Sequence, residues 1–388
     1  MVLCGEPLEP QNVIGRPTDV TRARRWIFAA LFLLAGIVLV TWATRTAWLA
    51  LSAYTDFWAD QELCDATGPD VDAQIAACTR QIDSGHRHGH DLAIEHYNRG
   101  IAWRAKGDLD RAITDYSEAI RVDPEYAHAY FNRGIAWAKK GELDRAIADY
   151  SEAIQLDPKD ADPYNSRGIA WRAEGDLDRA ITDYTEAIRV DPEYAHAYFN
   201  RGIAWAKKGD LDRAIADHTE AIRLDPKDAD PYRNRGDAYA SEKDYEHAIA
   251  DYTEAIRLDP ADANNFNLRC WIRALEGKDL NGALADCNES LRLRANDGNT
   301  FNSRGLVQFR LGAFDAAIAD YDTAIARNAN DAESLYARGV AKLKKGDAAG
   351  GNADIVAAKA IKPDIAAVSA DYGITVDAAG ANAAPEHK

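Results

Sequence analysis

The chain has 388 residues, of which 28% are charged, and a formal net charge of -17 at pH 7. So acidic a chain is repelled by phosphate backbones and by anionic lipid surfaces, which argues against nonspecific nucleic-acid binding and against a membrane-surface protein. The length alone would suit two or three globular domains. A repeat pattern overrides that expectation here, because each unit of a repeat array contacts only its neighbours.

The N-terminal part of the chain divides into a basic leader and an apolar stretch. Residues 1–25 carry four arginines spaced by prolines, and residues 26–43 contain no charged side chain. Eighteen residues in a helix span about 27 Å, close to the roughly 30 Å of a bilayer core. Arginines before the stretch indicate a cytoplasmic N-terminus. We therefore expect a single-pass helix in a bacterial inner membrane, with the rest of the chain in the periplasm.

Two alternatives to this anchor remain open. A cleavable signal peptide needs small residues at its cleavage site, and Thr41-Trp42-Ala43 fits that need poorly after so long a leader. A buried helix of a soluble protein would need a packing partner, which the sequence does not offer. We favour the uncleaved anchor.

Residues 44–92 form a juxtamembrane segment and a small separate module. Ala73 to Ile82 aligns with the second helix of the repeats that follow, which predicts a half-repeat covering the N-terminal face of the array. His86, His88 and His90 offer imidazoles for zinc or copper, but they alternate in a glycine-flanked loop with no cysteine at a ligand spacing. A solvated linker is the preferred interpretation, and we assign no metal and no cofactor.

From Ala93 the chain repeats a unit of 34 residues. Residues 127–160 recur at 195–228 with four changes, and a fixed period of this size predicts a solenoid. In the first unit a helically periodic run ends near Gly107, and a second run begins at Leu109 and stops at Asp123-Pro124. Each unit therefore predicts two helices joined by a tight turn.

Glycine inside the first helix of a unit costs about 1 kcal/mol relative to alanine. We expect these glycines to be packing sites that face small residues of the second helix, such as Ala112 and Ala119. Large residues three positions later would fill the space toward the next unit. The glycines are Gly100, Gly134, Gly168, Gly202 and Gly236, and the large residues are Trp103, Trp137, Trp171, Trp205 and Tyr239.

The unit resembles the tetratricopeptide repeat. The marks of that family are a small residue at position 8, aromatics at 11 and 24, alanines at 20 and 27, and proline at 32. In the first unit these are Gly100, Trp103, Ala112, Tyr116, Ala119 and Pro124. The resemblance implies an all-α fold, a right-handed α-solenoid. It covers five regular units over 93–262 and three degenerate ones over 263–365, and residues 366–388 would form a C-terminal cap and a disordered tail.

The resemblance also implies a binding surface. First helices of the family line a concave groove that holds an extended peptide or a partner helix, with an apolar floor, asparagine amides for a bound backbone, and basic edges. The alternative is that these residues are merely solvent-facing. Carried over, the groove residues are Tyr97, Asn98, Ile101, Arg104, Phe131, Asn132, Ile135, Lys139, Asn165, Ile169, Arg172, Phe199, Asn200, Ile203, Lys207, Arg233 and Asn234.

The cysteines beyond the apolar stretch form two pairs. Cys64 stands near Cys78, and Cys270 and Cys287 occupy positions 8 and 24 of the sixth unit, which face each other in the family. An oxidising compartment would favour two disulfides, each worth about 2 to 4 kcal/mol. Buried free thiols are the alternative, and the sequence leaves the connectivity open.

Two charged positions recur in all eight units. Position 7 is always arginine and position 23 always aspartate, which suggests bidentate pairs that link the two helices of each unit. Arginines that bind an acidic partner are the alternative. The arginines are Arg99, Arg133, Arg167, Arg201, Arg235, Arg269, Arg304 and Arg338, and the aspartates are Asp115, Asp149, Asp183, Asp217, Asp251, Asp286, Asp320 and Asp354.

No signature of catalysis is present in the sequence. It holds no glycine-rich phosphate loop, no zinc-protease motif and no nucleophile elbow, and its paired carboxylates recur in every unit as a helix-start pattern would. We predict a protein or peptide-binding scaffold with no enzymatic activity. The alternatives are a structural component of an envelope complex and, less favoured, a metal-dependent role at His86 to His90.

Overall fold

The computed structural model describes residues 59–66 and 70–376, and within these ranges every regular element is a helix. The described residues divide into two compact units, one up to residue 129 and one from residue 130 onward. The predicted leader (1–25), the predicted membrane span (26–43) and the end of the predicted tail (377–388) lie outside the described residues. Within the described residues, no helix combines the length and the apolar character that crossing a membrane requires.

The first unit contains a short helical segment, residues 59–65, followed by α3 (Val71–Asp83), α4 (Gly89–Ala105) and α5 (Leu109–Val122). The start of α5 shows why these helices begin where they do. Asp108 precedes it, and its carboxylate accepts a hydrogen bond from the Arg111 amide, which would otherwise lack a partner. The residues predicted to form a half-repeat, 73–82, lie within α3.

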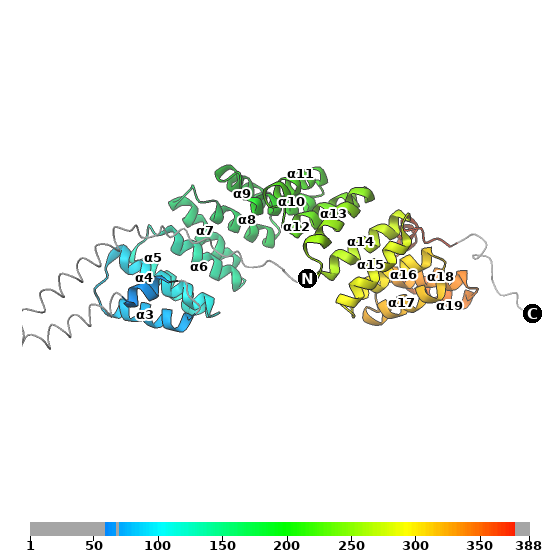
Figure 1. Ribbon diagram of the computed structural model, residues 1–388, viewed down its shortest axis with the longest axis horizontal. Coiled ribbons are helices and arrows are strands. Elements are labelled where there is room, and N and C mark those ends of the chain that lie inside the picture. Colours follow the sequence, from blue (N-terminus) through cyan, green and yellow to red (C-terminus); the bar gives the residue numbers. More distant parts are fainter. Residues whose placement is uncertain (1–58, 67–69, 377–388) are drawn as a thin grey trace, which may run out of the picture. The chain divides into compact units, whose positions relative to one another are not determined.

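The second unit continues the series of helix pairs, and the division between the units falls inside α6 (Figure 1). First helices such as α8 end at a glycine in the left-handed region, Gly175 at φ 90°, where a side chain would be strained. The helices are α6 (Ala127–Lys139), α7 (Leu143–Leu156), α8 (Ala161–Glu174), α9 (Leu177–Val190), α10 (Ala195–Lys208), α11 (Leu211–Leu224), α12 (Ala229–Ser241), α13 (Tyr245–Leu258), α14 (Ala263–Glu276), α15 (Leu280–Leu293), α16 (Gly298–Arg310), α17 (Phe314–Arg327), α18 (Ala332–Lys344), α19 (Ala348–Ile361) and α20 (Ile365–Asp371).

The glycines of the first helices are packing sites, but their partner is a ring and not an alanine. A Cβ atom built on Gly168 would lie 2.6 Å from Cε1 of Tyr184, which is fully buried at position 24 of the same repeat. Position 24 is also the nearest neighbour of Gly100, Gly134, Gly202, Gly236 and Gly305. The expectation of small residues on both helices was therefore incomplete, because the missing side chain makes room for an aromatic ring.

The predicted Arg–Asp ladder is confirmed in all eight repeats. Arg167 of α8 donates from Nε and Nη2 to the two carboxylate oxygens of Asp183 on α9, each at 2.8 Å. Its remaining nitrogen, Nη1, donates to Ser151 Oγ on α7 of the preceding repeat at 2.9 Å. One guanidinium thus joins three helices. The same bidentate pairing holds for Arg99–Asp115, Arg133–Asp149, Arg201–Asp217, Arg235–Asp251, Arg269–Asp286, Arg304–Asp320 and Arg338–Asp354.

The position-11 tryptophans Trp171 and Trp205 pack against the preceding repeat, whereas the sequence had suggested the next one. Trp171 contacts the buried cluster around Tyr150 on α7 and the one around Tyr184 on α9. Its outer face is covered by the guanidinium of Arg179, whose Cζ lies 4.6 Å from the ring centroid. A cation over the exposed face of an indole adds to the packing.

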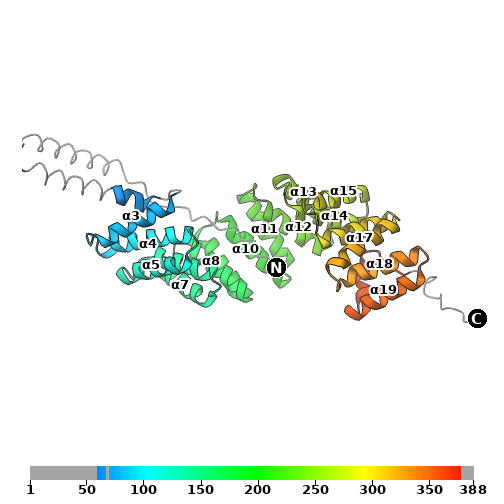
Figure 2. The ribbon, with the colours of Figure 1, turned by 90° about the horizontal axis from the view of Figure 1, so that it is seen from below.

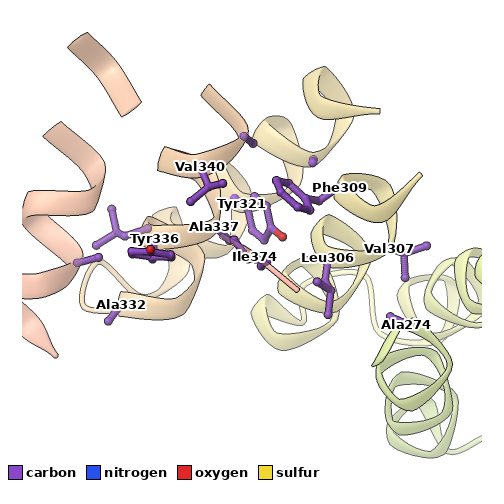
Figure 3. Packing of buried hydrophobic residues seen from close by; sticks show 14 of the residues in the cluster. Ala274, Leu306, Val307, Phe309, Tyr321, Ala332, Tyr336, Ala337, Val340 and Ile374 are labelled. Atoms are coloured by element: carbon purple, nitrogen blue, oxygen red, sulfur yellow. The ribbon is translucent and has the colours of Figure 1, made fainter. Parts of the chain in front are cut away.

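Both cysteine pairs are disulfides in the structure, Cys64–Cys78 with Cα atoms 4.8 Å apart and Cys270–Cys287 at 5.4 Å. The second bond occupies positions 8 and 24 of the sixth repeat, where the other repeats place a glycine against a ring or, in the eighth, against Ile355. It lies in the largest buried cluster, which extends through α14 to α20 and includes Leu306 and Tyr321 (Figure 3).

Candidate peptide-binding surface

In the second unit the first helices of successive repeats contact one another directly, α8 with α10 and α10 with α12. Second helices of successive repeats, such as α9 and α11, approach one another less closely, so the first helices lie on the inner side of the curve that these repeats follow. Figure 2 shows the helices of these repeats from below. Side chains three or four residues apart on these helices share one face. Positions 5, 9, 12 and 13 thus present a common inner surface.

Isoleucines form the centre of this surface. Ile135, Ile169 and Ile203 stand at position 9 of three successive repeats, and each is half-buried. A half-buried isoleucine at the same place in consecutive repeats leaves a row of apolar surface in contact with water, which a partner would cover favourably. We call Ile135, Ile169 and Ile203 the isoleucine row.

Basic side chains lie one turn beyond the isoleucine row. Arg172 is half-buried at position 12, and Lys207 is exposed at position 13 of the next repeat. Neither forms an ion pair with any residue in 59–66 or 70–376. Lys139 is also exposed, at position 13 of the second repeat. The surface therefore combines apolar contact area with positive charge on a chain that is otherwise strongly acidic.

The isoleucine row ends at the fifth repeat, where position 9 is Asp237. The Tyr252 hydroxyl donates to Asp237 Oδ1 at 2.7 Å. Arg233, predicted as a groove residue, instead pairs with Asp230 at 2.7 Å and lies 3.7 Å from Asp262. This repeat uses its polar groups internally, so it bounds the apolar surface.

The predicted asparagine amides are not available to a ligand, which corrects the sequence-based expectation. Asn165 is fully buried and accepts a hydrogen bond from Asn200 Nδ2 at 3.1 Å. Asn132 and Asn98 are buried as well, and Asn98 donates to Asp65 Oδ1 at 3.1 Å. Asn234 Nδ2 donates to the carbonyl of Asp230 within its own helix. Four of the five predicted asparagines are thus buried, and the amides of Asn98, Asn165, Asn200 and Asn234 bond to groups of the protein.

Aromatic residues at position 5 serve the core more than the surface. Phe131 is only 9% exposed, with its ring centroid 5.9 Å from that of Tyr150. Phe199 is half-buried and its ring lies 5.7 Å from His218. These rings support the isoleucine row from beneath, and Phe131 in particular offers little area to a ligand.

The first unit carries three further predicted groove residues. Ile101 and Arg104 of α4 are half-buried, and Arg104 forms no ion pair with any described residue. Tyr97 packs its ring against Tyr116 at 5.9 Å and against Tyr126 at 5.1 Å. The first repeat therefore presents the same combination of isoleucine and free arginine as the third.

Within the described residues, none of the histidines considered as metal ligands belongs to a group of three ligand-type side chains. His90 Nδ1 contacts the Asp123 carboxylate, and His88 precedes the first residue of α4. Across the described ranges, the one group of three such side chains is Cys64, Cys78 and Glu95, whose two sulfur atoms are bonded to each other. The place of Glu95 in this group could not be foreseen from the sequence, because Glu95 stands among ordinary helix residues.

The repeats match models of a known protein family. Models of the tetratricopeptide repeat match residues 97–161, 166–229 and 229–262, and a further model of the same repeat matches 308–346. The chain is a tetratricopeptide repeat protein. The matches include the regular repeats and the seventh, so the tetratricopeptide register used above is that of the family. A search of curated proteins finds no match.

Several solved structures are similar to this tetratricopeptide repeat protein. MamA is 26% identical, with 42% of this chain and 96% of MamA covered and a TM-score of 0.40. YrrB, described as a TPR protein with an unusual peptide-binding site, is 24% identical over 48% of this chain and 94% of YrrB, with a TM-score of 0.41. PilF of Pseudomonas aeruginosa is 18% identical over 54% and 94%, with a TM-score of 0.48.

Proposed function

We propose that the chain is a protein-interaction scaffold that binds a partner segment along the isoleucine row. The observation that carries this proposal is the row itself: three half-exposed isoleucines in successive repeats, with the unpaired cations Arg172 and Lys207 beside them. Such a surface suits a segment with apolar side chains at its centre and carboxylates at its edge. Affinity would be summed over the repeats that the segment contacts. Arrays of these repeats typically act as scaffolds and not as enzymes.

Photo-crosslinking tests the surface. Photoreactive residues at Ile169 and Ile203 would be compared with one at Ala216, which is exposed on α11. In intact cells of the native source, we expect both inner positions to crosslink to the same partner segment and Ala216 not to do so. Crosslinks from the inner positions to other copies of this chain alone would instead favour a structural component of a fixed assembly.

A charge variant sharpens the test. Arg172→Glu reverses one cation but leaves the isoleucine row and the Arg167–Asp183 pair unchanged. If the partner segment is acidic, its crosslinking yield at Ile203 falls in this variant and the yield in the wild type falls with added salt. Unchanged yields in both experiments would contradict the acidic character of the partner.

We also propose, from the sequence, that the solenoid faces the periplasm and is anchored by residues 26–43. This uncharged stretch after four arginines supports the proposal, as do the two disulfides, one in the N-terminal module and one in the sixth repeat. A cysteine introduced at Ala216 should react with a membrane-impermeant maleimide in spheroplasts. Labelling only after lysis would place the solenoid in the cytoplasm.

A further inference from the structure

The segment after α20 lies against first helices of the C-terminal repeats. The Tyr372 ring meets the Trp271 ring edge-on, with centroids 5.1 Å apart, and Trp271 belongs to α14. Asp371 Oδ2 is 3.6 Å from Lys243 Nζ at the end of the fifth repeat's first helix. The chain therefore reaches back from the eighth repeat toward the sixth, over the inner side of the array.

Ile374 is the second anchor of this segment. It is 4% exposed and belongs to the buried cluster that contains Leu306 of α16 and Val340 of α18 (Figure 3). Val376 packs against the same cluster. Tyr372 and Ile374, separated by one residue, thus fix the turn that ends α20 and the chain directly after it.

The covered residues are those that carry the isoleucine row elsewhere. Trp271, Leu306 and Val340 stand at position 9 of the sixth, seventh and eighth repeats. Leu306 and Val340 are each 1% exposed, whereas Ile135, Ile169 and Ile203 are half-buried at the same position. In the last repeats the inner surface already has an occupant, which is the chain's own end, α20 together with the segment that follows it.

Gly373 allows the segment to pass between its two anchors. Its φ is 76°, and a Cβ atom there would lie 3.1 Å from Nη2 of Arg310. The guanidinium cannot easily move away, because Arg310 Nη1 donates to the carbonyl oxygens of Ala274 and, at 2.9 Å, of Leu275 at the end of α14. The surface therefore has room only for a glycine between the aromatic and the β-branched residue.

We propose that residues 372–376 are a ligand held in cis, and that the inner face of α14, α16 and α18 is a second binding site. It takes partner segments of the same chemistry, an aromatic residue, a glycine and a β-branched apolar residue in succession, once the C-terminal segment is displaced. The proposal rests on the proposed function in treating the inner face as a binding surface. It concerns residues in different repeats from the isoleucine row.

The tethered segment competes with any partner at high local concentration. A short tether gives an effective concentration on the order of millimolar, so a free peptide binds the intact chain much more weakly than a chain whose segment has been released. Within the described residues, the backbone hydrogen bonds of the segment run from the amides of Tyr372, Gly373 and Ile374 to Ser369 or Ala370 at the end of α20. The segment can therefore leave the inner face without breaking a backbone hydrogen bond to α14, α16 or α18.

Peptide binding to a released chain tests the proposal. The probe is a fluorescein-labelled peptide of residues 369–376, and the proteins are the full chain, its Ile374→Asp variant and a chain ended at Asp371. We expect fluorescence anisotropy to show binding to both altered chains at least about tenfold tighter than to the full chain. A matched peptide carrying Ile374→Asp should not bind, because the buried anchor is lost.

Circular dichroism and thermal melting first establish that each altered chain keeps its helices. If a folded Ile374→Asp chain and a folded chain ended at Asp371 both fail to bind the peptide, the inner face of α14, α16 and α18 is not a binding site and the proposal is overturned. The crosslinks from Ile169 and Ile203 do not involve this face. Their success or failure is thus independent of the peptide result.

Discussion

Arg201 and Asp217 meet through two parallel hydrogen bonds of 2.8 Å, and the third arm of the guanidinium donates to Thr185 Oγ1 of the preceding repeat at 3.1 Å. The pair is largely buried between α9, α10 and α11. A bidentate pair at the same place in every repeat holds each first helix to its own second helix, and a third arm that donates backward, as in Arg201 and Arg167, also holds it to the second helix before it. This arrangement fixes the angle between successive repeats, and that angle determines how the inner surface curves.

Asp217→Ala should destabilise the solenoid by about 2 kcal/mol. The substitution leaves the Arg201 guanidinium without its carboxylate, and we take a value below the 3 to 5 kcal/mol of fully buried pairs because Arg201 is partly exposed. Urea denaturation measures the loss. Asp212→Ala, an exposed acid on the same helix, is the control and should cost about 0.5 kcal/mol. Equal stabilities for the two variants would remove support for the ladder.

Gly168→Ala should destabilise the chain even though alanine is the better helix former. The new methyl group would lie 2.6 Å from a ring atom of Tyr184, which is fully buried and has no free space to move into. Overpacking costs about 1 to 3 kcal/mol and outweighs a gain of about 1 kcal/mol in helix propensity. The stability of Gly168→Ala is compared with that of Ala173→Gly, an exposed substitution in the same helix. A more stable Gly168→Ala chain would show that the close contact is not needed.

His218 should make the chain sensitive to acid. It replaces the tyrosine of the other regular repeats and is fully buried; burial first, and the nearby charge of Arg235 second, lower its pKa from 6.5 to about 4. Protonation therefore favours the unfolded chain, so stability is complete above pH 6.5 and declines as the pH falls toward 4. The loss amounts to at most about 3 kcal/mol.

The second repeat supplies the matched variant for this prediction. It is nearly identical to the fourth but has Tyr150 where the fourth has His218. His218→Tyr should stabilise the chain more at pH 4.5 than at pH 7.5, and Tyr150→His should introduce a second acid-sensitive step. A stability difference between wild type and His218→Tyr that is the same at both pH values would contradict the assignment.

Glu95 should make the first unit less stable as the pH rises. It is 2% exposed, its Oε2 atom lies 2.9 Å from Cys64 Sγ, and Arg87 Nε is 3.7 Å from the other oxygen. Burial first, and the charge of Asp65 second, raise its pKa to about 7 from 4.5. The folded state favours the protonated form, so this stability is complete below pH 4.5 and is lost as the pH passes 7.

Glu95→Gln removes the carboxylate and keeps the shape of the side chain. Hydrogen exchange of α3 and α4 should be slower in the variant than in wild type at pH 8, and equal at pH 5 after correction for intrinsic rates. The exposed change Glu125→Gln serves as control. Faster exchange in Glu95→Gln at pH 8 would mean that the carboxylate is stabilising and that its pKa is not raised.

Lys243→Gly should stabilise the chain. Lys243 has φ 63°, and in equivalent turns the residue is a glycine, such as Gly175 or Gly209. A side chain in the left-handed region costs about 1 kcal/mol, which glycine avoids. Thermal denaturation would show the gain as a higher Tm. A lower Tm would mean that the exposed contact of Lys243 with Asp371 is worth more than the strain.

Much of the local structure could be predicted from the sequence. The helix pairs and the Arg–Asp pairs follow from the 34-residue register, because residues 16 or 17 apart in one unit face each other across its two helices. The register also brings Cys270 opposite Cys287, but the sequence left open whether the two thiols form a bond. The role of the glycines was harder to predict. Register shows that Gly168 faces the second helix, but not that the Tyr184 ring, and not an alanine, fills the space.

The binding surface needed the tertiary structure. Asn165 carries a groove mark by position, yet its amide is buried against Asn200 of the next repeat, and that pairing depends on how closely two first helices approach. The position of Tyr372 on Trp271 depends on the summed angles of three repeats. The sequence by itself determined the repeat unit and the contacts inside it, since these are local and recur. Only the tertiary structure decided which inner residues remain exposed to solvent and which are covered by the C-terminal end of the chain. The physical reason is that small angles between repeats accumulate, and no single unit encodes their sum.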